Sequence, residues 1–290
     1  TIHSSRTRFA GRLNSGVRRQ MTILLRVDDF RCHDQHLVHV LPGREREATC
    51  FARQLLSQGV PAGLFVRGED VTDWGFLEDA MGVEHFEFVD FSKTLSSSKL
   101  SPISHAKYLR IVGRKLPVDF SIFTNLQTIC YHWHPESSGL ESLNLLKSAY
   151  LYEIGMAKNA DPFPLPPSVE KLELVGFRGE SIDFMSEMSR LIDLEIIYAR
   201  NLRKLPRLIS LKEIELKNVG RDAFDYDSIP ESVEGIVIEA CAPVRDWDFI
   251  RNLNSLKRLV VFKTKCAPAS SVAKSALGLV PMRDLPRGVA

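Results

Sequence analysis

The chain has 290 residues, 44% of them hydrophobic, so it can bury a large core and is too apolar to be disordered throughout. Its 38 Lys and Arg residues against 36 Asp and Glu residues give a formal net charge of +2, which argues against nucleic-acid-binding and membrane-surface proteins as classes. No apolar run approaches the roughly 20 residues that span a bilayer. The five cysteines are scattered without a CxxC pair, as is typical of reduced thiols. We therefore predict a cytoplasmic protein without membrane contact.

Residues 1–20 carry five arginines and no acidic residue. We interpret them as a basic leader or arm that need not belong to the native mature chain. An organellar transit peptide is one alternative, because such peptides are rich in Arg and Ser and poor in acids. A nucleic-acid-binding arm is another, but nothing else in the sequence supports a nucleic-acid partner, so none is expected.

Residues 21–59 have the pattern of an N-terminal cap, a β-hairpin followed by a helix. The segments TILLRV (22–27) and HLVHVLP (36–42) read as two strands separated by a polar break. The next segment ends on Gly59, a good helix terminator, and places apolar residues at helical spacing. These residues are Ala48, Phe51, Ala52, Leu55 and Leu56.

A repeated phrase, apolar–x–x–apolar–x–apolar, dominates residues 60–266. Successive phrases begin 20 to 23 residues apart, and a period in the low twenties indicates a solenoid of stacked repeats. Gly63 occupies an apolar position in the first phrase, which makes that unit weak. The phrases begin at Val60, Val83, Ala106, Leu126, Leu146, Val169, Leu191, Leu211, Val233 and Leu256.

Each phrase predicts a strand of about five residues that cannot bury its apolar side alone. Stacked in parallel, these strands share one core, with return segments packed behind them. Proline before several strands, as in LPPSVEKL and IPESVEGI, favours short helices, 3₁₀ turns and extended pieces over long helices in those returns. The tail, residues 267–290, has no repeat and is predicted to be a C-terminal cap or a loose end, with a short helix over SSVAKSALGLV.

Over roughly 60–265 the chain resembles the leucine-rich repeat family, and the phrase PPSVEKLEL is similar to units of bacterial repeat effectors. The resemblance implies an α/β solenoid shaped as a horseshoe, with about nine or ten repeats and a parallel concave sheet. The family usually places Asn three positions after the last apolar residue, where its amide pairs with backbone groups. Here only Cys241 and Thr264 are common substitutes, so a less regular turn, or another stacked β/α arrangement, stays open. The other three positions hold Phe177, Ala199 and Val219.

Motifs for catalysis and for cofactors are absent from the sequence. No Gly-rich phosphate loop, GxSxG or HExxH occurs. Cys130, His132 and His134 alternate along one phrase and would share a strand face, which makes a metal site or a Cys–His pair conceivable. An aromatic and polar strand surface is the preferred interpretation. We therefore predict no metal, no cofactor and no enzymatic activity.

The positions between the apolar residues point toward the concave face. The position between the second and third apolar residues runs through nine repeats and places three glutamates on neighbouring strands. Like charges at that spacing, about 4.8 Å, cost stability. They form either a binding face for a basic partner or a solvated patch neutralised by Lys171 and Lys217. The nine positions are Glu87, Arg110, Cys130, Tyr150, Glu173, Glu195, Glu215, Val237 and Val260.

Aromatic and aliphatic residues flank the three glutamates, a mixture that protein interfaces prefer. Val175 and Ile197 lie between the flanks, and burial of Val237, Val260 and Phe262 under the C-terminal tail is the alternative for that flank. Residues 169–240 hold fifteen acidic and ten basic residues, so this half is acidic. The predicted partner-binding residues are Tyr108, Arg110, His132, Tyr150, Tyr152, Glu173, Asp193, Glu195, Glu213, Glu215, Val237 and Phe262.

The predicted function is therefore non-enzymatic binding of a partner protein by the concave face. By analogy with compact repeat proteins that have acidic concave faces, the partner is expected to be a basic toxin or enzyme, which the protein would neutralise as an immunity or inhibitor protein. A scaffold or substrate-recognition domain of an effector is the alternative. A metal-dependent enzyme that uses His132, His134 or Cys130 is the weakest hypothesis.

Overall fold

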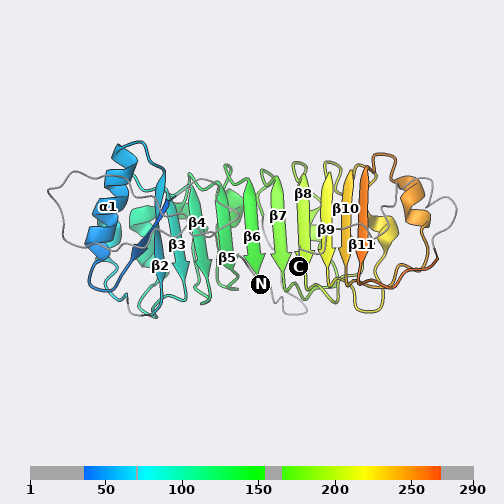
Figure 1. The fold of residues 1–290 in the computed structure, drawn as a ribbon, viewed down its shortest axis with the longest axis horizontal. Helices are drawn as coiled ribbons and strands as arrows, with labels where there is room; N and C mark the ends of the chain where they lie inside the picture. The colour runs from blue at the N-terminus through cyan, green and yellow to red at the C-terminus, as the bar shows by residue number, and fades with distance from the viewer. Residues whose placement is uncertain (1–35, 70, 154–164, 269–290) are drawn as a thin grey trace, which may run out of the picture.

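The computed structural model describes residues 36–69, 71–153 and 165–268, and its centre is one open parallel sheet (Figure 1). Eleven strands follow one another in sequence order, β1 to β11, without a crossover. The strands are β1 His36–Val40, β2 Ala62–Arg67, β3 His85–Val89, β4 Tyr108–Val112, β5 Thr128–His132, β6 Ser148–Tyr152, β7 Lys171–Val175, β8 Asp193–Ile197, β9 Glu213–Lys217, β10 Gly235–Glu239 and β11 Arg258–Phe262.

The strands pair in step, so equivalent residues of successive repeats lie side by side. Leu172 pairs with Leu194, Leu194 with Ile214 and Ile214 with Ile236, and the same register continues on both sides. The second and fourth residues of strands β3 to β10 are buried. Because side chains alternate across a strand, one face of the sheet is continuously apolar and the other carries the first, third and fifth residues. The predicted parallel α/β solenoid is confirmed.

The predicted register of the second strand is wrong by one residue. The phrase beginning at Val60 would have placed Gly63 and Phe65 in the core, whereas the structure buries Leu64 and Val66 there. Gly63 faces the concave side, where a Cβ atom would lie 2.8 Å from the Cβ atom of His85. A glycine supplies no apolar side chain, so the core pattern is taken one residue later.

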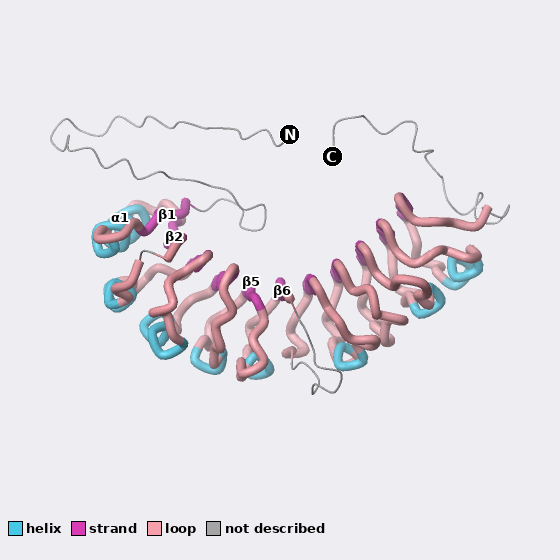
Figure 2. Tube along the Cα trace, turned by 90° about the horizontal axis from the view of Figure 1, so that it is seen from below, coloured by secondary structure: helices cyan, strands magenta, loops and turns pink. Residues whose placement is uncertain are grey.

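Short 3₁₀ segments back the sheet on its convex side, as the prolines predicted. They carry buried apolar residues, among them Phe76, Leu100, Phe120 and Phe249, that complete the core behind the strands. The segments are η1 Gly75–Asp79, η2 Ser97–Ile103, η3 Phe120–Ile122, η4 Leu140–Ser142, η5 Asp183–Met185, η6 Tyr226–Ser228 and η7 Asp248–Asn252. In Figure 2 the strands line the inner side of an arc and the helical segments its outer side, which is the expected horseshoe.

The one α-helix of the described residues, α1 (Glu45–Ser57), packs against β1 and β2 at the end of the sheet. It lies where the cap helix was expected, and β1 occupies the segment of the second predicted cap strand. β1 pairs in parallel with β2, so the sheet begins inside the segment interpreted as a cap. The first cap strand, the basic arm and the predicted C-terminal helix lie outside the described residues.

A left-handed residue follows every strand from β2 to β11 except β5. In seven of these turns the backbone N–H of this residue donates to the carbonyl oxygen of the last residue of the next strand, as from Gly176 to Ile197 at 2.8 Å. Gly113 N–H donates to the His132 side chain instead, and β11 is the last strand of the described residues. Positive φ lets the chain leave the sheet sharply while this hydrogen-bond ladder continues. Glycine, Asn and Asp adopt it readily and bulkier residues at a cost. The nine residues are Gly68, Asp90, Gly113, Glu153, Gly176, Tyr198, Asn218, Ala240 and Lys263.

Candidate functional site

The concave face consists of three rows of side chains, from the first, third and fifth residues of the strands. The register confirms the predicted middle row residue for residue from Glu87 to Val260. The two halves of this row differ in exposure. Glu87, Cys130, Tyr150 and Glu173 are buried, whereas the row is half-exposed from Glu195 onward.

A charged network lies in the N-terminal half of the face. His85 Nε2 is 3.0 Å from Glu87 Oε1, and Arg110 Nη1 donates to Glu87 Oε2 at 3.2 Å. The Tyr108 ring stacks on His85 with centroids 4.0 Å apart. His85 and Glu87 are almost fully buried, so the network fixes the first strands of the face and leaves Arg110 as its half-exposed member.

An apolar cluster adjoins this network on the same side of the sheet. Val112, Cys130 and Tyr150 form its buried part, and Val89 and Tyr152 pack against it. Tyr108 and Tyr150 are each less than a tenth exposed. Of the tyrosines predicted to bind a partner, only Tyr152 is half-buried and reaches the surface.

The residues of the hypothetical metal site make separate contacts. His132 Nδ1 accepts a hydrogen bond from the Gly113 backbone N–H at 3.1 Å, and His134 Nδ1 accepts one from Glu136 N–H at 3.2 Å. Burial lowers the pKa of His132, aided by nearby Lys115 and opposed by Glu153 and Asp90. Across the described ranges, no group of three or more His, Cys, Asp or Glu residues is arranged to hold a metal ion.

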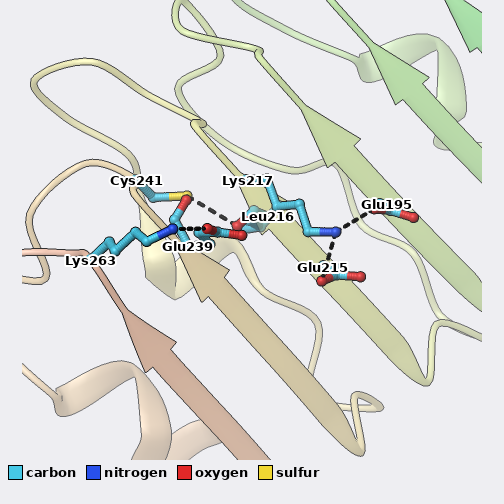
Figure 3. A network of polar contacts seen from close by, with 7 residues as sticks. All are labelled: Glu195, Glu215, Leu216, Lys217, Glu239, Cys241 and Lys263. Carbon is cyan, nitrogen blue, oxygen red and sulfur yellow. Dashed lines mark hydrogen bonds and ion pairs between the residues drawn. The ribbon is translucent and has the colours of Figure 1, made fainter. Parts of the chain in front are cut away.

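Lys217 bridges two of the three predicted glutamates. Its Nζ atom lies 2.8 Å from Glu195 Oε1 and 3.0 Å from Glu215 Oε1 (Figure 3). Burial acts to lower the pKa of Lys217, but the two carboxylates outweigh it and the pKa is raised. The third glutamate, Glu173, is only 3% exposed. Its neighbour across the ladder is the bulky Tyr150, whereas Glu195 and Glu215 neighbour each other.

Further ion pairs cross the first row. Lys171 Nζ donates to Asp193 Oδ2 at 2.6 Å, a hydrogen bond that raises the pKa of Lys171. Glu213 reaches past β10 to Arg258, with Nη2 and Oε2 2.8 Å apart. A Cβ atom on Gly235 would lie 1.9 Å from Glu213 Oε2, so glycine leaves the space for this bridge. The structure therefore places the acidic patch together with its own cations.

The concave rows of β7 to β11 keep a negative excess all the same. They hold six acidic residues and three basic ones, so six minus three leaves a net charge of −3. Lys263, in the turn after β11, pairs with Glu239 at 2.9 Å. The six acids are Glu173, Asp193, Glu195, Glu213, Glu215 and Glu239, and the three bases are Lys171, Lys217 and Arg258.

Cys241 and Thr264 perform the backbone pairing that the resemblance implied for the turn. Cys241 Sγ accepts from Val219 N–H at 3.4 Å and lies 3.2 Å from the Leu216 carbonyl oxygen (Figure 3). Thr264 Oγ1 accepts from Cys241 N–H at 3.1 Å. Burial raises the pKa of Cys241 to about 11, so this thiol is protonated at neutral pH.

Sequence reasoning missed Arg258, Glu239 and Lys263 as members of the face. The signal was present, because each lies at a row position or one residue beyond it. Lys263 follows its partner Glu239 by about one period, and Arg258 follows its partner Glu213 by about two. The signal was weak, since the long side chain of a lysine or arginine can reach several carboxylates at that spacing. Only the side-chain positions show which pairs form.

No protein-family model and no curated protein matches the chain. Among solved structures, an internalin from Listeria monocytogenes is similar to it, with 14% sequence identity over 83% of this chain and 84% of that one, and a TM-score of 0.45. The eleven in-step strands with short convex segments are an open solenoid that fits a leucine-rich-repeat-like fold. Such solenoids offer extended concave surfaces suited to protein binding. No helix within the described ranges is long and apolar enough to span a membrane.

Proposed function

We propose that the protein binds a partner protein through the concave rows of β7 to β11. The observation that carries this proposal is the mixture of half-exposed carboxylates and aliphatic side chains on adjacent, in-step strands. Glu195 and Glu215 adjoin Val237 and Val260 in the middle row, and Ile197 lies beside them in the last row. Apolar residues surrounded by polar ones are what protein interfaces favour.

The excess charge of these strands supports a basic partner, and we propose a cytoplasmic inhibitor or immunity protein that neutralises a basic toxin or enzyme. A negative field accelerates the encounter with a cation and makes the rate salt-dependent. Lys217 restrains this attraction because it already pairs with both Glu195 and Glu215 and offsets one of their two negative charges. A lysine or arginine of the partner would have to share or replace that contact.

The predicted contacts of the N-terminal half contribute less directly in this proposal. Tyr108 and Tyr150 are buried, so they shape the face from beneath. Arg110, His132 and Tyr152 are half-buried and border the contact region. Phe262, half-buried on the last described strand, borders it on the other side.

The test is affinity capture from the source cells with the wild-type chain and with Glu195→Gln/Glu215→Gln. Glu173 is left unchanged because altering a buried carboxylate risks unfolding. The matched control is Glu141→Gln/Glu187→Gln, which removes the same charge at exposed residues of the convex side. We expect the wild type and the control to retain one basic protein in stoichiometric amount, and the concave variant to lose it.

The activity of the captured protein then separates the two candidate functions. Inhibition by the purified wild-type chain supports the inhibitor proposal. Unchanged activity supports the alternative, a scaffold or recognition domain. Equal capture by all three chains would overturn the concave interface in β7 to β9.

A further inference from the structure

A hollow of about 610 Å³ lies on the carboxyl edge of the sheet, outside the concave rows. The described residues that line it are Glu153, directly after β6, and residues of the turns that follow β4, β7 and β8. The residues that matter for its chemistry are Lys115, Glu153, Arg178, Tyr198, Arg200 and Asn201. This site is independent of the proposed concave interface.

Two arginines enter the hollow from equivalent positions of neighbouring repeats. Arg178 and Arg200 each follow the last residue of their strand by three positions, and both are exposed. The turns are joined by the hydrogen bond from Asn201 Nδ2 to the Arg178 carbonyl oxygen at 2.9 Å. Neither guanidinium takes part in an ion pair with any residue that the structure describes. Among the described residues, two positive charges thus share one hollow without a carboxylate paired to either.

Lys115 lies at the same turn position after β4 and is paired with Glu153, with Nζ and Oε2 3.2 Å apart. Counted over the described lining residues, three cations and one carboxylate give the hollow a net charge of +2. This differs from the concave face, where Lys171 and Lys217 contact carboxylates of adjacent strands. The hollow therefore suits an anion.

Tyr198 occupies the left-handed position of its turn, with φ of 58°, and the residue is 56% exposed. A residue with a Cβ atom pays roughly 1 kcal/mol for this conformation. The same position holds Gly113 and Gly176 in other repeats. Packing does not account for an exposed tyrosine there, whereas a ring in the wall of an anion-binding hollow could pack against an organic group.

We propose that this hollow binds a phosphate monoester. The planar guanidinium groups of Arg178 and Arg200 match phosphate oxygens in bidentate fashion, and Lys115 adds a third positive charge. The Tyr198 ring contacts the organic group of the ester. The ester could belong to a small phosphorylated molecule or to a phosphotyrosine side chain, which present the same chemistry.

Calorimetric titration of the full chain at pH 7.5 and low salt with phenyl phosphate, inorganic phosphate and phenol tests the proposal. We expect saturable 1:1 binding of phenyl phosphate and none of phenol. Arg178→Gln/Arg200→Gln should weaken phenyl phosphate at least tenfold. Tyr198→Asn should weaken phenyl phosphate severalfold without altering inorganic phosphate, and should not reduce thermal stability, because Asn tolerates positive φ.

Arg203→Gln/Arg221→Gln is the matched control, since it removes the same charge from exposed residues of the turns after β8 and β9, outside the hollow. Binding as in the wild type is expected. Equal weakening by the control would show general charge attraction and overturn the site, as would the absence of saturable phenyl phosphate binding. A phosphotyrosine peptide that binds more tightly than phenyl phosphate would assign the ester to a phosphorylated protein. Equal affinity would assign it to a small molecule.

Discussion

Lys217 is the residue on which the electrostatics of the concave face depend most. Its ammonium group contacts two carboxylates on adjacent strands, which would otherwise repel each other. The same contact stabilises the sheet and reduces the charge available to a basic partner. Stability and binding therefore place opposite demands on this residue.

We predict that Lys217→Met lowers the free energy of unfolding by roughly 0.5–1 kcal/mol at pH 7 and low salt, a modest figure because the pair is partly exposed. The pKa of Lys217 is raised, so its contribution is present at neutral pH and is lost as the pH rises above the usual range of a lysine. Urea denaturation of both chains measures the difference. Binding of the captured basic partner should become tighter in the variant. An unchanged affinity would show that Lys217 does not compete for Glu195 and Glu215.

A second prediction at the residue scale concerns His132 and the pH dependence of folding stability. Burial lowers its pKa, so the unfolded chain takes up a proton near pH 6.5 while the folded chain does not. Its contribution to stability is therefore present above pH 6.5 and is lost as the pH falls toward the folded pKa. His132→Asn should lose less stability than the wild type between pH 7.5 and pH 5 in urea denaturation. An identical pH dependence in the two chains would contradict this assignment.

At the scale of single elements, the left-handed turn after each strand controls how the chain leaves the sheet. Gly113 and Gly176 both occupy it, but their surroundings differ. A Cβ atom on Gly113 would lie 2.1 Å from Asp90 Oδ1 and 2.9 Å from Asp90 N, whereas one on Gly176 would lie 3.5 Å from its nearest neighbour. The positive φ disfavours a side chain at both positions, whereas a steric clash excludes one only at Gly113.

We predict that Gly176→Ala lowers the free energy of unfolding by about 1 kcal/mol, from backbone strain alone. Gly113→Ala should cost about 2 kcal/mol or more, since Asp90 must also move and the hydrogen bond from Gly113 N–H to His132 is disturbed. Chemical denaturation of the two variants side by side gives the comparison. Equal losses would mean that the clash with Asp90 relaxes freely.

The strands were predictable from sequence because each repeat must bury the same two strand positions. Apolar residues therefore recur along the chain at a regular spacing. The register failed only at β2, where Gly63 carries no side chain to mark its face. Exposure within the face was not predictable. Glu173, Glu195 and Glu215 have the same place in the phrase, yet Glu173 is buried beside Tyr150 and the other two are not. Neighbours on other strands decide this difference.

At the scale of the whole molecule, each strand is stabilised mainly by the strands on either side. Leu172 lies between β6 and β8 and is fully buried, whereas Leu259, at the equivalent position of β11, is half-buried. In a solenoid of this kind, stability is approximately a sum of repeats and of interfaces between neighbours.

We predict that Leu172→Ala lowers the free energy of unfolding by about 3 kcal/mol and Leu259→Ala by about 1–2 kcal/mol. The second loss is smaller because Leu259 is half-buried, so its truncation removes less buried apolar area and leaves a smaller enclosed cavity. Thermal or urea denaturation of the two variants measures both losses. A loss at Leu259 as large as at Leu172 would show that the sheet end is covered in solution.

The unbroken register has a consequence for how such a molecule can change over generations. A whole repeat could be duplicated or lost without shifting any core residue of the others, because each unit meets only its two neighbours. The reach of the surface would grow or shrink by one strand spacing, about 4.8 Å. Substitutions at the outward positions would meanwhile alter what that surface recognises, leaving the interior untouched. Size and specificity can therefore evolve separately in this chain.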